Sequence, residues 1–132
     1  MDTELVKLTY DQIVALHLQI ESGDEIVFSE KRLKSNLEFL NQFNDLELYA
    51  THLICTMICD DIFEKYNQQT ALVALDFFLR QNGHELDLDN ESERNQLSEL
   101  MKKIKEADQL KKDDLEEIRL VLSSCIHTST NE

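Results

Sequence analysis

The fold of this chain is decided near its middle, where residues 61–72 read Asp61-Ile62-Phe63-Glu64-Lys65-Tyr66-Asn67-Gln68-Gln69-Thr70-Ala71-Leu72. The stretch then runs on to end in Phe78-Leu79-Arg80-Gln81-Asn82-Gly83. Apolar side chains recur at helical spacing between Thr70 and Asn82. Gly83 follows in the position where a glycine commonly ends a helix. The pattern therefore predicts a loop over residues 61–67 and a helix over residues 70–82.

The segment before this loop, residues 46–62, is apolar on most faces. A helix that is hydrophobic nearly all round is normally surrounded by other elements, so we expect this one at the centre of the domain. Asn44 and Glu47 have the spacing of a capping box, which predicts the start of the helix.

Further helix signals precede the central pair. Thr9 and Gln12 fit a capping box at the start of a helix that Gly23 would end. Ser29 is a candidate cap for a second helix. The apolar face of that helix consists of Leu33, Leu37 and Leu40. The short β-leaning run at residues 25–28 lies between the two.

Helix signals also follow the central pair. One helix is expected after Ser92 and another from about Asp113 through Ile126, whereas the alternation over residues 84–89 indicates a short strand. We therefore predict an all-α, single-domain helical bundle of about six helices, with at most a short β flap, over residues 1–127. Residues 128–132 are expected to be a frayed C-terminal tail.

Composition supports this fold class and limits the function. The chain has 132 residues, no proline and two glycines, which favours helices joined by short turns. The net charge of −14 disfavours direct contact with nucleic acid or an anionic membrane and favours a basic partner. No apolar run reaches the roughly 18 residues needed to span a bilayer, and no secretory signal pattern is present, so we expect a cytoplasmic protein. The odd cysteine count predicts reduced thiols.

Residues 61–83 resemble the signature of the Fic/Doc (death-on-curing) family, which reads His-x-Phe-x-x-(Ala/Gly)-Asn-Lys-Arg-Thr-Ala-Leu and is followed by a helix ending in Asn-Gly. The shared positions are Phe63, Asn67, Thr70, Ala71, Leu72, Phe78, Leu79, Arg80, Asn82 and Gly83. Residues 8–17 also resemble the first helix of Doc proteins, including its terminal His17. The resemblance covers most of residues 8–88 and implies a Fic/Doc-like helical domain. Enzymes of this family transfer AMP or a phosphate from a nucleotide to a protein hydroxyl.

The chain departs from the signature where the chemistry resides. Asp61 stands in place of the catalytic His, and a carboxylate is a weak base at neutral pH. Gln68 and Gln69 replace the Lys-Arg pair that holds phosphates. Lys65 is the only cation nearby in sequence, and it stands where the family commonly has an acid that helps to hold a metal. The resemblance with these departures implies a protein that is not an enzyme and that uses no cofactor or metal.

The retained residues have structural interpretations. Phe63 is expected to anchor the loop in the core, Asn67 to shape the loop, and Arg80 to form an ion pair. His17 and His127 are isolated in the sequence and are interpreted as ordinary surface or interface histidines.

Two further patterns are weak metal signals. His52, Cys55 and Cys59 share one helix face, but they lie in a very apolar segment, so we interpret the two thiols as small buried side chains. The acids at residues 87–91 lack the glycine and the distal glutamate of a calcium loop, which favours a solvated turn.

The sequence therefore predicts a catalytically inactive Doc-like protein that acts by binding another protein. The resemblance suggests a mobile-element setting: a toxin–antitoxin locus, a prophage, or an acidic inhibitor of a host nucleic-acid-binding defence protein. The residues expected to contact the partner are Asp60, Asp61, Glu64, Glu85, Asp87 and Asp89. Homodimerisation stays open. The alternatives are a divergent Fic/Doc phosphotransferase or nucleotidyltransferase toxin with Asp61 or His17 as its base, and an antitoxin-like regulator that pairs with an active Doc homologue.

Overall fold

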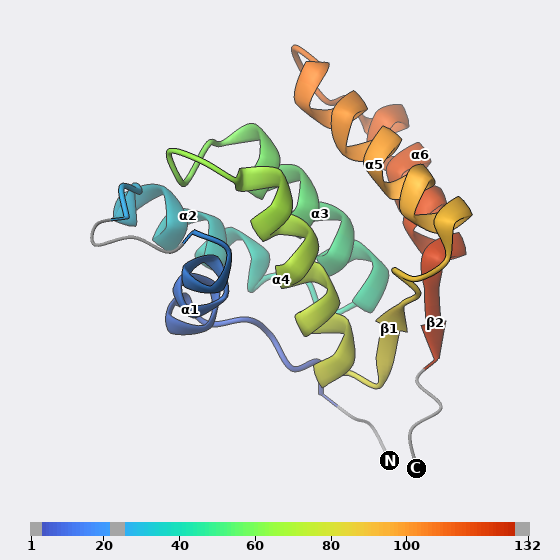
Figure 1. Ribbon diagram of the computed structural model, residues 1–132, viewed down its shortest axis with the longest axis horizontal. Helices are drawn as coiled ribbons and strands as arrows, with labels where there is room; N and C mark the ends of the chain where they lie inside the picture. The colour runs from blue at the N-terminus through green and yellow to red at the C-terminus, as the bar shows by residue number, and fades with distance from the viewer. Residues whose placement is uncertain (1–3, 22–25, 129–132) are drawn as a thin grey trace.

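The computed structural model describes residues 4–21 and 26–128, and these ranges contain six helices and two short strands (Figure 1). The helices are α1 (Tyr10–Ile20), α2 (Glu30–Leu40), α3 (Leu46–Cys59), α4 (Asn67–Gln81), α5 (Glu91–Glu106) and α6 (Lys112–Cys125). The strands are β1 (His84–Leu86) and β2 (Ile126–Thr128). The predicted all-α bundle with a short β element is confirmed. Among the described residues, no helix combines the length and the apolar character needed to cross a membrane.

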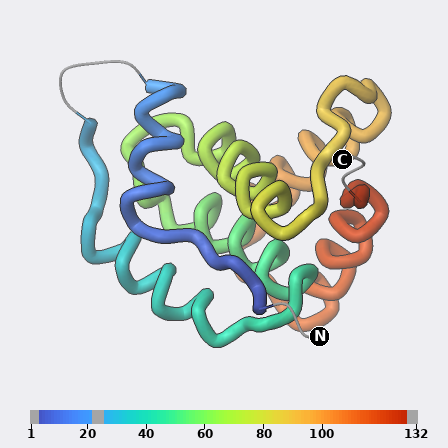
Figure 2. The backbone as a smooth tube through the Cα atoms, turned by 90° about the horizontal axis from the view of Figure 1, so that it is seen from below, coloured from blue at the N-terminus to red at the C-terminus, as the bar shows by residue number. Residues whose placement is uncertain are grey.

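The central position of α3 is also confirmed. This helix packs against α2, α4, α5 and α6, and its side chains are buried on most faces. Figure 1 shows α1, α2 and α4 on one side of α3 and the α5–α6 hairpin on the other, and Figure 2 shows the same grouping from below. The Tyr49 ring of α3 stacks on Phe78 of α4 with 4.3 Å between ring centroids, which joins the two predicted central helices.

Two predicted caps are confirmed. The Thr9 hydroxyl accepts a hydrogen bond from the Gln12 N–H at 3.2 Å, and the Gln12 side chain accepts one from the Thr9 N–H at 3.0 Å. Ser29 caps α2 by accepting from the Arg32 N–H. The predicted apolar face of α2 is buried. Gly23 lies outside the described residues.

The predicted start of α3 at Leu46 is confirmed, but its predicted cap and its predicted last residue were wrong. The cap is Asp45 rather than Asn44, and its carboxylate accepts from the Leu48 N–H, where the helix dipole favours a negative charge. The helix ends at Cys59 rather than at Ile62. It ends early because Asp61 has left-handed backbone geometry, with φ of 47°.

Helix α4 begins at Asn67, three residues before the predicted Thr70. The preceding Tyr66 has a left-handed φ of 65°, and no side chain caps the helix there. At the other end, Gly83 has a φ of 80° after the last turn, which confirms its predicted role.

Three predictions for the C-terminal third were wrong. Asn90 caps α5, not Ser92, because its side chain accepts from the Glu93 N–H. Ile126 belongs to β2 rather than to the last helix. The antiparallel pairing sets His84 of β1 opposite Thr128 of β2, so residue 128 belongs to the domain and not to the predicted tail. The rest of the predicted tail, residues 129–132, lies outside the described residues.

Candidate functional site

The loop that joins α3 to α4, which we call the motif loop (residues 60–66), is anchored to the segment before α2. Phe28 and Phe63 form an isolated antiparallel bridge. Beside this bridge, the Ser29 N–H donates to the carbonyl oxygen of Ile62 at 2.8 Å. The described part of the predicted β-leaning run, residues 26–28, therefore contributes one bridge to the motif loop, and Glu25 lies outside the described residues.

Asn67 closes the motif loop from the first turn of α4. Its Oδ1 accepts from the backbone N–H of Phe63 at 2.9 Å, and its Nδ2 donates to the backbone carbonyl of Phe63 at 2.6 Å. One carboxamide thus satisfies both peptide groups of one loop residue, which confirms the predicted loop-shaping role.

Phe63 anchors the motif loop as predicted. Its side chain is 1% exposed, and its ring stacks on the imidazole of His17 with 3.8 Å between centroids and 8° between planes. The interpretation of His17 as a surface or interface histidine was wrong, because its exposed fraction is 0%. A signal was present: His17 follows Ile13 by four residues, so both lie on the buried face of α1.

Both ring nitrogens of His17 have partners. Nδ1 lies 2.7 Å from the hydroxyl oxygen of Thr70, and Nε2 lies 2.8 Å from a carboxylate oxygen of Glu21. Thr70 is itself fully buried at the start of α4. The three side chains therefore tie the end of α1 to the first turns of α4 in the interior, and the imidazole is not presented to solvent.

Two cations from distant elements lie beside the motif loop. The Lys105 ammonium of α5 is 3.0 Å from the Asp61 carboxylate. The Arg32 guanidinium of α2 donates to the backbone carbonyl of Asp60 at 3.1 Å and lies 3.4 Å from that of Asp61. Lys65 is therefore not the only cation nearby. Sequence spacing gave no sign of the other two, because tertiary packing brings them in.

The first turn of α4 carries neither charge nor cap. Gln68 and Gln69 stand there, and the turn contains no acidic side chain. The first N–H groups of a helix have no partner within the helix and carry partial positive charge. This end of α4 is therefore open to an acceptor from outside.

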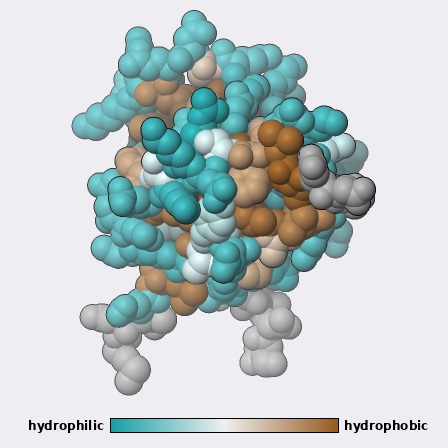
Figure 3. Space-filling model, turned by 90° about the vertical axis from the view of Figure 1, so that its left-hand side faces the viewer, coloured by the Kyte–Doolittle hydropathy of each residue, from teal (hydrophilic) through white to brown (hydrophobic). Residues whose placement is uncertain are grey.

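The surface of the motif loop combines acids with large apolar groups. Asp60, Asp61 and Glu64 are exposed, and so are Tyr66 at 44% and Val27 at 56%. Figure 3, which faces the side of the molecule where α2 lies, shows hydrophobic areas set in a mostly hydrophilic surface. Exposed aromatic side chains are typical of surfaces that bind proteins, and polar side chains commonly form the rim around them.

The six acidic residues predicted to contact a partner form two groups rather than one. Asp60, Asp61 and Glu64 precede α4, while the other three follow it, and a helix of 15 residues is about 22 Å long. In the second group, Glu85 is half-buried and lies 3.7 Å from the Arg80 guanidinium. Arg80 also pairs with Asp76 at 2.9 Å, which confirms its predicted ion pair.

The two patterns that are weak metal signals in the sequence do not form a metal site among the described residues. Cys55 is buried as predicted, and burial raises the pKa of its thiol to about 12. Cys59 is exposed, so the expectation that it is buried was wrong, although partial burial and then the Asp60 carboxylate raise its pKa. Within the described residues, no group of three or more His, Cys, Asp or Glu side chains could hold a metal ion. Asp87 and Asp89 are exposed, as expected for a solvated turn.

His127 lies at the surface as predicted. Its Nε2 is 2.8 Å from a carboxylate oxygen of Glu93, and this hydrogen bond raises the pKa of the imidazole. The contact joins β2 to the first turn of α5.

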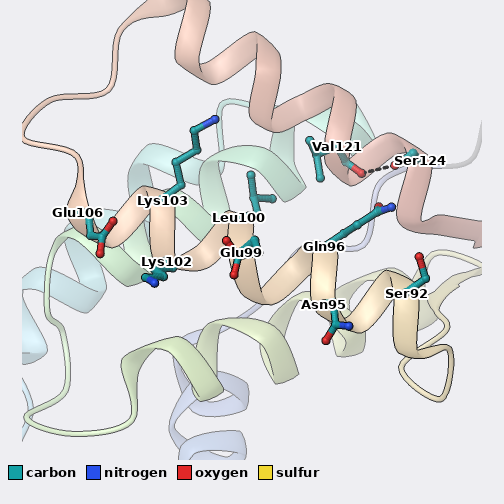
Figure 4. Close-up of a pocket in the computed structure, with 10 residues that line it drawn as sticks. All are labelled: Ser92, Asn95, Gln96, Glu99, Leu100, Lys102, Lys103, Glu106, Val121 and Ser124. Atoms are coloured by element: carbon teal, nitrogen blue, oxygen red, sulfur yellow. Dashed lines mark hydrogen bonds between the residues drawn. The ribbon is translucent and has the colours of Figure 1, made fainter.

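A spacious cavity lies away from the motif loop. It is an open groove of about 910 Å³ between α5 and α6 (Figure 4), which we call the α5–α6 groove. Its lining consists of Ser92, Asn95, Gln96, Glu99, Leu100, Lys102, Lys103, Glu106, Val121 and Ser124. A smaller cavity of about 440 Å³ lies beside the loop, where Asp60 and Lys105 line it together with His52 and Cys59.

Comparison of the chain with protein-family models, with curated proteins and with solved structures gave no significant match.

Proposed function

We propose that the chain is a catalytically inactive Doc-like protein that acts by binding another protein with a basic surface. The observation that supports this most is that the groups which catalysis would require are already engaged within the chain. Asp61 pairs with a lysine, Asn67 holds the loop backbone, and His17 is buried with both ring nitrogens bonded.

Neither of the two candidate bases, His17 and Asp61, is well placed for catalysis. A general base must come within hydrogen-bonding distance of the hydroxyl that it deprotonates. His17 is enclosed by Phe63, Thr70 and Glu21, so a target hydroxyl has no route to it. The Asp61 carboxylate is accessible, but it is paired with the ammonium group of Lys105.

The same surface suits recognition of a protein. Its exposed carboxylates attract lysine and arginine side chains of a partner and speed the encounter. Tyr66 and Val27 supply apolar contact area next to these acids. With a net charge of −14, the protein repels nucleic acid and attracts a basic protein surface. An inhibitor of a nucleic-acid-binding protein, carried by a mobile element, fits this chemistry.

An affinity capture experiment from the native host tests the proposal. In one triple variant, Asp60→Asn, Asp61→Asn and Glu64→Gln neutralise the motif loop. In a matched variant, Asp87→Asn, Asp89→Asn and Glu91→Gln remove the same charge beyond the other end of α4. We expect the wild-type chain to capture one protein. Rising salt should weaken this capture, and of the two variants only the motif-loop variant should lose it. Capture that neither variant weakens would contradict the proposal.

A second candidate function, a divergent phosphotransferase or nucleotidyltransferase, is favoured by one observation. The uncapped start of α4 and the nearby Arg32 and Lys105 could together accept a phosphate. Calorimetric titration with Mg-ATP distinguishes the two functions. Micromolar binding that Arg32→Ala abolishes and the neighbouring Lys31→Ala retains would favour the enzyme.

A further inference from the structure

The α5–α6 groove is a second surface that the proposed function does not use. Figure 4 shows its lining side chains spread along the whole of α5, from Ser92 to Glu106, with Val121 and Ser124 contributed by α6. The groove is open and elongated, as a surface that receives a helix would be.

The groove is electrically neutral in a very acidic protein. Its lining contains two acids, Glu99 and Glu106, and two lysines, Lys102 and Lys103, while the whole chain carries a net charge of −14. Two copies of such a chain repel each other across most of their surface. A neutral groove is where they could approach with the least repulsion.

We propose that the α5–α6 groove is the interface of a homodimer, in which the α5 helices of two copies lie antiparallel. The twofold axis passes between Glu99 and Lys102. Such an interface must be self-complementary, because the same patch meets itself.

The charge order along α5 meets this requirement. In this register, Glu99 of each copy faces Lys102 of the other, so symmetry forms the ion pair twice. The same register sets Asn95 against Glu106, an amide that can donate to a carboxylate. Within the described part of the chain, neither Glu99 nor Lys102 forms an ion pair, so both are available to a second copy.

An apolar contribution comes from α6. Leu120 is 56% exposed, somewhat more than Leu18 at 48% and Leu48 at 41%. It precedes Val121 by one residue and Ser124 by four, so it borders the groove on the side of α6. A second copy seated on α5 would cover Leu120 together with the half-buried Val121.

Sedimentation velocity over protein concentrations from about 1 μM to 1 mM, a range that spans weak to moderate dimers, tests this proposal. The wild-type chain of 15.4 kDa is expected to shift toward twice its mass as concentration rises. Lys102→Glu places like charges opposite each other twice and is expected to raise the dimer Kd roughly tenfold or more. The double variant Glu99→Lys with Lys102→Glu exchanges the charges and is expected to restore the dimer.

Lys31→Glu on α2 is the matched control, since it changes the net charge equally at an exposed site far from the groove. It is expected to leave the Kd close to that of the wild type. A protein that stays monomeric over the whole range would overturn the proposal. So would equal Kd values for Lys102→Glu and Lys31→Glu, or a charge-exchanged variant that fails to dimerise while circular dichroism shows that it is folded.

Discussion

Replacing Asn67 by alanine is expected to destabilise the protein, because its carboxamide satisfies both peptide groups of Phe63. Leaving a buried donor or acceptor without a partner costs about 1–3 kcal/mol per group. These hydrogen bonds are only partly buried, so water can replace them in part. The lower end of this range, about 1 kcal/mol, therefore applies to each group. Alanine regains about 0.5 kcal/mol of helix propensity at the start of α4. The expected net loss is about 1.5 kcal/mol.

Urea unfolding measures this loss. With an m-value of about 2 kcal/mol/M, a loss of about 1.5 kcal/mol lowers the unfolding midpoint by about 0.75 M. Asn67→Asp is expected to fall between alanine and wild type, because it keeps an acceptor for the Phe63 N–H but sets a carboxylate against the Phe63 carbonyl. The adjacent Gln68→Ala is the control and is expected to change stability by less than about 0.5 kcal/mol. An Asn67→Ala midpoint equal to that of Gln68→Ala would refute the loop-shaping role.

Three further predictions concern the interior and the surface. Thr70→Val removes the hydroxyl that binds buried His17 and should cost about 1–2 kcal/mol in urea unfolding, and a loss below about 0.3 kcal/mol would contradict the buried hydrogen bond. Exposed Cys59 should react with a disulfide reagent before buried Cys55, which should react only on unfolding. The rate at Cys59 should increase as pH rises, because its pKa is raised and the thiolate is the reactive form. Equal rates for the two thiols in the native protein would contradict this prediction. The Glu93 carboxylate raises the pKa of His127. The contact therefore contributes fully to the free energy of unfolding below the unfolded-state pKa of about 6.5, and this contribution disappears as pH rises through the folded-state pKa. An NMR titration of His127 with a pKa at or below that of a model peptide would contradict this linkage.

The elements that local chemistry specifies could be predicted from the sequence. The reciprocal bonds of Thr9, the cap at Ser29 and the left-handed Gly83 depend on residues within three or four positions of each other. Errors arose where neighbouring residues could make the same bond. Asp45 replaced Asn44 and Asn90 replaced Ser92 as caps, because each can accept from the same kind of N–H.

The surroundings of the motif loop could be predicted only in part. The bond between Asn67 and Phe63 spans four residues, so the sequence could indicate it. By contrast, His17 and Thr70 are 53 residues apart, and Lys105 is 44 residues from Asp61. Such contacts depend on how α1 and α5 pack against the central pair. Periodicity indicated the buried face of α1, but it could not indicate which polar group the imidazole would meet.

The central claim is that the polar side chains Asp61, Asn67 and His17 are engaged within the chain, so that the motif loop does not bind a nucleotide. Amide chemical shifts of residues 61–70, followed in ¹⁵N-labelled protein as Mg-ATP is added to about 1 mM, test this claim most directly, since even a weak complex would then be populated. We expect the chemical shifts of those amides to stay unchanged throughout the titration. Saturable shifts confined to the start of α4 would show that the site still binds a nucleotide and would contradict the account.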